Sequence, residues 1–191
     1  MNSSPTPPTR RSRRALLIGG SLAAAAAAVA AGGYWVGTSR PAIAPESFAG
    51  LSNALRTLEA LRAQPLQTAS GWDMAQVLHH AAQSIEYSMD GFPAPKPAWF
   101  RATVGPAAFA VFSARGRMNH DLHEPIPGAP AIAAGQALLP AVERAIEALQ
   151  RFDRHSGPLA PHFAYGALSK PDFERAHLMH FANHWQLVRQ A

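Results

Sequence analysis

Apolar residues recur every three or four positions in several stretches of this chain, and that spacing places them on one face of an α-helix. The first stretch runs from Leu51 to Gln64-Pro65, and the second runs from Met74 to Met89. We expect Ser70 to cap the second helix and Asp90-Gly91-Phe92-Pro93 to end it. No stretch alternates with a period of two for long enough to predict a sheet. The pattern therefore favours an all-α protein.

The second half of the chain contains two further stretches of this kind. The last one begins at Ser169-Lys170-Pro171-Asp172, where proline is acceptable because it lies in a first helical turn. The residues of the third helix that we expect to face inward are Leu138, Leu139, Val142, Ile146, Leu149 and Phe152.

Two regions between these helices are less regular. Residues 93–118 contain Pro106, which would break a helix, so we expect either one broken helix or two short ones. Residues 119–134 are rich in proline and polar groups and predict a long surface loop. Together these elements predict an antiparallel four-helix bundle with long loops over residues 46–191.

Residues 1–37 have the layout of an export signal. A basic start precedes a segment without charge from Ala15 to Gly37, and Arg13 and Arg14 stand directly before apolar residues, as in a twin-arginine signal. We expect either a signal peptide or a retained membrane anchor helix, followed by a linker over residues 38–45. In both cases the twin-arginine export machinery is the expected partner. The domain would then lie outside the cytoplasm, in the periplasm or on the outer face of the inner membrane.

The formal charge of +5 does not indicate a nucleic-acid partner. Four of the 17 basic residues are arginines of residues 10–14, so the remaining 13 nearly balance the 12 acidic ones. No basic stripe is left in the domain to bind phosphates. Cysteine is absent, which excludes disulfides, thiolate ligands and a cysteine nucleophile.

The last helix carries three histidines in the stretch HLMHFANHWQLV. At about 100° per residue, His177, His180 and His184 all fall on the apolar face around Phe173. His180 and His184 are one turn apart, so their rings can converge on one metal ion. The alternative is that these are core histidines satisfied by hydrogen bonds.

Other histidines give a weaker signal. His79 and His80 follow one another in the second helix, and periodicity places His80 on a polar face with Tyr87, which it predicts to be exposed. The cluster from His120 to Glu124 lies in the proline-rich loop. We interpret it as solvated, with a pocket rim or a weak metal site as the alternative.

The spacing of Trp72 and His80 in WDMAQVLHH, together with HFANH near the end, resembles the DinB (YfiT-like) superfamily of four-helix bundles. The stretches QSIEYSMDGFP and HFAYGALS resemble the branch catalogued as family DUF1569. This resemblance implies one metal ion bound by His80, His180 and His184. It leaves His177, and Tyr87 beside His80, as candidate supporting residues around the ligands.

The resemblance also implies a function. Three neutral histidines leave coordination positions open, as in catalytic sites, and imidazole ligands favour zinc or nickel. We expect a metal-dependent enzyme that acts on a small-molecule substrate, either as a thiol-dependent transferase or as a hydrolase. The alternative is a non-catalytic binding protein of the cell envelope that holds no metal.

Overall fold

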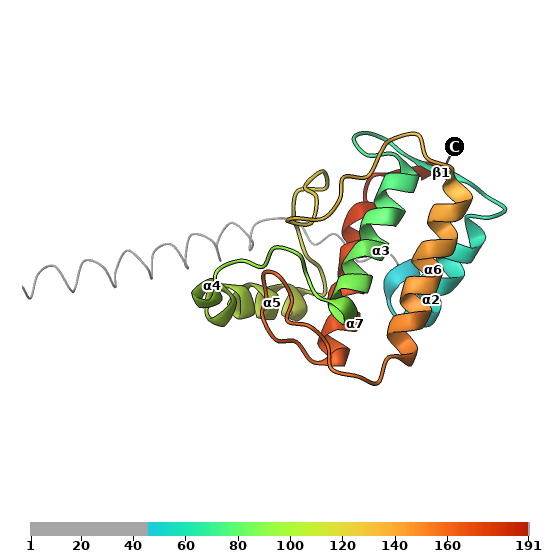
Figure 1. Ribbon diagram of the computed structural model, residues 1–191. Coiled ribbons are helices and arrows are strands. Elements are labelled where there is room, and N and C mark those ends of the chain that lie inside the picture. The colour runs from blue at the N-terminus through green and yellow to red at the C-terminus, as the bar shows by residue number, and fades with distance from the viewer. Residues whose placement is uncertain (1–45, 191) are drawn as a thin grey trace, which may run out of the picture. The chain divides into compact units, whose positions relative to one another are not determined.

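The computed structural model describes residues 46–190 (Figure 1). The predicted signal, with Arg13 and Arg14, and the predicted linker lie outside the described residues. The elements in chain order are η1 (Glu46–Phe48), α2 (Leu51–Ala60), β1 (Leu66–Thr68), α3 (Met74–Asp90), α4 (Ala98–Ala102), α5 (Val104–Arg115), α6 (Leu138–Arg154), α7 (Lys170–Trp185) and β2 (Val188–Gln190). Among these described helices, none is both long enough and apolar enough to cross a membrane.

Helices α2, α3, α6 and α7 pack around one core, so the prediction is confirmed in so far as the described residues are mainly α-helical. The largest fully buried side chains come from all four helices and include Leu58, Leu78, Phe152, Phe173 and Phe181. Burying each of these side chains contributes about 1.5–3 kcal/mol before entropic costs. Leu139 was expected inside but is 54% exposed, because it lies about 100° around the helix from Leu138, which packs against the core.

The expectation of antiparallel neighbours holds for only part of the bundle. His80 lies beside His180, and Ser88 lies beside His177, so α3 and α7 run in opposite directions. Glu86 pairs with Arg144, and Asp90 pairs with Arg151, so α3 and α6 are adjacent and parallel (Figure 1). The reason is the long connection over residues 91–137, which returns the chain to the end of the bundle where α3 began.

Local signals fix the helix ends that position the site. Asp73, rather than Ser70, caps α3, and its side chain accepts the Gln76 backbone N–H in a reciprocal capping box. Gly91, with φ of 103°, ends the helix in a conformation that favours glycine. Ser169 caps α7 as expected, with proline in its first turn. The 93–118 region forms the two short helices α4 and α5, which are separated at Thr103.

A small sheet was not predicted. Strands β1 and β2 pair antiparallel, with Leu66 opposite Gln190 and Thr68 opposite Val188. Strands of three residues are too short to show alternation in the sequence. The pairing ties the segment after α7 to the segment before α3, and so holds together the two helices that carry the histidines.

The 119–134 loop covers the polar face of α3. The side-chain amides of Gln76 and Gln83 donate hydrogen bonds to the backbone carbonyls of Ile132 (2.9 Å) and Pro130 (3.3 Å). The prediction that this face is exposed was wrong, since His80 on the same face is only 3% exposed. Periodicity failed here because a loop can bury polar side chains when its carbonyls satisfy them.

Candidate metal centre

Three histidines from two helices converge in the interior. Nε2 of His180 lies 3.1 Å from Nε2 of His80 and 3.1 Å from Nε2 of His184. All three side chains are buried, with exposed fractions of 3% for His80, 9% for His180 and 2% for His184. The structure thus brings together the three residues that the sequence singled out, in a group that could hold a metal ion.

Hydrogen bonding alone cannot satisfy this arrangement. An imidazole nitrogen carries either one hydrogen or one lone pair, so Nε2 of His180 can bond to only one of its two neighbours. A cation that accepts a lone pair from each nitrogen would satisfy all three. Nitrogens that bind zinc tetrahedrally at about 2.0–2.1 Å are about 3.3 Å apart, close to the spacing found here. The donor set therefore fits a divalent metal ion.

The environment keeps these histidines neutral. Burial, followed by repulsion from His120, lowers the pKa of His80 to about 4. Burial, with repulsion from His80, lowers the pKa of His184 to about 2, and the same causes place the pKa of His180 well below its usual value. Metal ligation requires neutral imidazole. All three rings meet this requirement at neutral pH.

Trp72 supports the group from one side. Its ring packs edge-on against His80 at 5.0 Å and stacks over His184 at 6.4 Å, measured between centroids. Nδ1 of His80 is buried, and within residues 46–190 it has no hydrogen-bond partner. The His80 ring is therefore positioned by packing rather than by a hydrogen bond behind it.

His120 is the site residue that sequence reasoning missed. The two histidines of the polar cluster from His120 to Glu124 lie in different environments. His123 is exposed, whereas His120 lies beside the other rings. Its ring lies 4.9 Å from that of His180 and 5.2 Å from that of His184. The only signal in the sequence was histidine within a polar loop, and the alternative of a pocket rim is the one that the structure shows.

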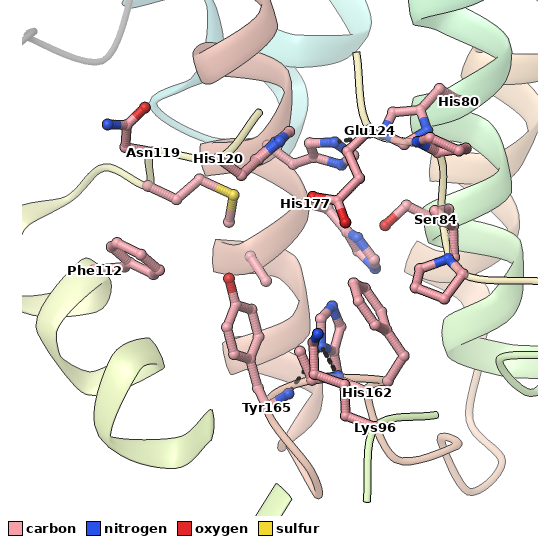
Figure 2. A pocket seen from close by; sticks show the side chains of 18 residues that line it. His80, Ser84, Lys96, Phe112, Asn119, His120, Glu124, His162, Tyr165 and His177 are labelled. Carbon is pink, nitrogen blue, oxygen red and sulfur yellow. Dashed lines mark hydrogen bonds between the residues drawn. The ribbon is translucent and has the colours of Figure 1, made fainter. Parts of the chain in front are cut away.

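A cavity of about 240 Å³ adjoins two of the three histidines, His80 and His180, and is drawn in Figure 2. His80 and His180 line one part of the cavity. His120 and Glu124 line it from the loop, and Figure 2 labels both together with His80. The remaining wall carries polar side chains, which are those of Ser84, Lys96, Asn119, His162, Tyr165 and His177. The volume is below the roughly 300–1,000 Å³ typical of pockets for drug-sized ligands, so it suits a small molecule.

His162 forms part of this wall in a fixed tautomer. Its Nδ1 accepts the backbone N–H groups of Ala164 and Tyr165, both at 3.1 Å, so the ring hydrogen is on Nε2. The ring stacks on Tyr165 at 4.3 Å. Burial, followed by repulsion from His177, lowers the pKa of His162 to about 3, and burial raises the pKa of Tyr165 to about 12.

The two candidate supporting residues lie apart from the three Nε2 atoms. His177 is buried. The Ser88 hydroxyl donates its hydrogen to the carbonyl of Ile85, so Nε2 of His177, at 3.3 Å from Ser88 Oγ, is the donor in their hydrogen bond. Burial lowers the pKa of His177 to about 3. Tyr87 packs on Phe92 at 5.9 Å. His177 lines the cavity, whereas Tyr87 does not.

Comparison with known proteins gives one match. A family model described as "Protein of unknown function (DUF1569)" matches residues 46–191. Neither the curated proteins nor the solved structures include a match.

Proposed function

The chain belongs to the DUF1569 family, and we propose that it is a metal-dependent enzyme with a DinB-like helical bundle. The observation that carries this proposal is the convergence of three buried, neutral Nε2 atoms from His80, His180 and His184 beside a small cavity lined by both apolar and polar side chains. A buried cluster of this kind has no evident structural use, because hydrogen bonds among its members cannot satisfy all of them.

Zinc or nickel is the ion that best suits these ligands. The donors are imidazole nitrogens, which favour late first-row metals, whereas magnesium and calcium prefer oxygen. A bound ion would supply Lewis acidity at the end of the cavity, which lowers the pKa of a coordinated nucleophile and polarises a substrate.

The side chains of the cavity would do the remaining work. Among the residues that line it, Glu124 alone carries a carboxylate, so it is our candidate for accepting the proton of an attacking water or thiol. Nδ1 of His162 accepts two backbone N–H groups, so the ring hydrogen is on Nε2, which can donate it to a substrate oxygen. Apolar walls from Phe112, Met118 and Ile126 limit the access of water.

The reaction we propose is transfer of a substrate group either to water or to a low-molecular-weight thiol. The absence of cysteine means that a thiol would come from a second substrate. Residues 1–37 resemble a twin-arginine signal, and export of the domain favours water, because such thiols are mainly cytoplasmic. Localisation outside the cytoplasm is part of the same proposal.

Elemental analysis of the protein, purified without a histidine tag, tests the metal centre. We expect one equivalent of zinc or nickel in the parent, and loss of the metal in His80→Ala and in His184→Ala. His155→Ala is the matched control, because His155 lies at the surface end of α6 and should keep the metal. A folded parent that takes up neither ion on titration would refute the proposal.

A screen of hydrolytic and thiol-dependent substrates would then follow, with Glu124→Gln as the test of the base. We expect this variant to keep its metal and to lose activity by roughly 100-fold or more, within the range of general base catalysis. Full activity in Glu124→Gln would remove that residue from the proposal.

The second candidate is a non-catalytic binding protein of the envelope. It is favoured by exposed apolar side chains on α4 and α5, namely Trp99 (65%), Val104 (47%) and Val111 (37%). Exposed apolar groups of this kind can mark an interaction surface. The metal analysis separates the two candidates, since only the enzyme requires a stoichiometric ion.

A further inference from the structure

The ring of His120 lies at nearly the same distances from the two α7 histidines as the ring of His80. The centroid of His80 lies 4.8 Å from that of His180 and 5.2 Å from that of His184. The corresponding distances for His120 are 4.9 Å and 5.2 Å. The pair on α7 is thus flanked by one histidine from α3 and one from the 119–134 loop, at nearly equal distances.

The tautomer of His120 leaves a lone pair on Nε2, as binding of a metal ion requires. Its Nδ1 lies 2.7 Å from the carbonyl oxygen of Asp121, and a carbonyl only accepts, so Nδ1 carries the hydrogen and Nε2 carries the lone pair. Histidines that bind metals commonly donate their second nitrogen to a backbone carbonyl in this way. None of the described residues is a hydrogen-bond partner of the buried Nε2 of His120.

An unpaired acceptor of this kind costs about 1–3 kcal/mol when it is buried. Burial lowers the pKa of His120 and keeps the ring neutral. The three nitrogens of His80, His180 and His184 lie within 4.8 Å of one another, and His120 is not part of that group, although its ring adjoins those of His180 and His184.

We propose that Nε2 of His120 is the fourth protein ligand of the metal ion, supplied by the 119–134 loop. This inference rests on the proposed function, because it requires the ion held by His80, His180 and His184. In this proposal the loop moves so that the lone pair of His120 meets the ion, which removes the cost of leaving that lone pair unpaired.

The 119–134 loop is anchored to α3 downstream of His120. Downstream of His120 it is fixed to α3 through Gln76 and Gln83, and Asp73 accepts the backbone N–H of Gly135 at 2.7 Å. The other three ligands sit on packed helices, so His120 is the ligand most easily exchanged. Because His120 also lines the cavity, a substrate that occupies the cavity meets this ligand and can replace it.

X-ray absorption of the zinc-loaded protein tests the proposal without relying on activity. We expect four imidazole nitrogens around zinc in the parent, and three in His120→Ala. Competition with a chelator should show zinc affinity at least tenfold weaker in His120→Ala than in the parent. His123→Ala is the matched control, since it removes an exposed histidine from the same loop and should leave coordination and affinity unchanged.

The result that overturns this inference alone is a parent with three imidazoles and one oxygen ligand, whose affinity is unchanged in His120→Ala. A folded parent that binds no zinc would overturn the proposed function as well, so the two failures are distinguishable. The spectrum of the parent decides the coordination number even if His120→Ala fails to fold.

Discussion

His162→Asn should reduce the sensitivity of the fold to acid. The ring of His162 is buried, and its pKa in the folded protein is about 3, against 6.5 in an exposed chain. Below pH 6.5 the unfolded state therefore binds a proton that the folded state does not bind. The free energy of unfolding falls as the pH falls from 6.5 towards 3, and this part of the stability is fully present above pH 6.5.

The size of the effect follows from the shift. One pKa unit corresponds to about 1.4 kcal/mol, so this histidine costs the folded state about 2 kcal/mol between pH 7 and pH 5, and about 3 kcal/mol between pH 7 and pH 4. Asparagine keeps an acceptor where Nδ1 of His162 binds the backbone N–H groups of Ala164 and Tyr165, but it does not titrate. The variant should be less stable at pH 7 and should lose less stability on acidification.

Urea unfolding at several pH values, followed by circular dichroism with a chelator present, measures this difference. Tyr165→Phe is the matched control, because it alters the same stack without changing a group that titrates in acid. It should follow the pH dependence of the parent. If the free energy of unfolding changes with pH in the same way for the parent and for His162→Asn, the reasoning is refuted. That result would show that His162 binds protons equally in the folded and unfolded states.

Three further substitutions test the fold by chemical denaturation. Asp73→Ala removes the capping box of α3 and should cost about 1–2 kcal/mol; an unchanged midpoint would contradict this role. Gly105→Ala would place a Cβ 2.0 Å from the carbonyl oxygen of Ala164 and should cost at least about 2 kcal/mol, whereas Gly50→Ala, with open space, should cost less than about 1 kcal/mol. Phe181→Ala opens a cavity in the core and should cost about 3–5 kcal/mol; a loss below 1 kcal/mol would show that the core collapses around it.

The helical core was predictable because its signal is local. Apolar residues spaced by three or four positions identified the helices, and Ser169 and Gly91 marked helix ends that the structure confirms. The same periodicity placed His180 and His184 on an inward face. The residues that determine a helix, its ends and its inward face are close together in the sequence, so these features can be predicted from the sequence alone.

Contacts between distant segments limited the prediction of the site. The face of α3 that carries His80 is polar, and only the carbonyls of Pro130 and Ile132 make its burial acceptable. Resemblance to a family identified His80, whereas periodicity placed it on the surface. No local pattern distinguished the inward His120 from the exposed His123, because both lie in an irregular loop.

The sequence by itself determined the all-α class, the main helices and the pair of histidines one turn apart on α7. Three features depended on the tertiary structure: α3 runs parallel to α6, a loop buries the polar face of α3, and His80, His180 and His184 converge with the ring of His120 beside them. The physical reason is that periodicity records which face of a helix is apolar. The direction of a long connection and the partners of a buried polar group depend on where the whole chain folds back on itself.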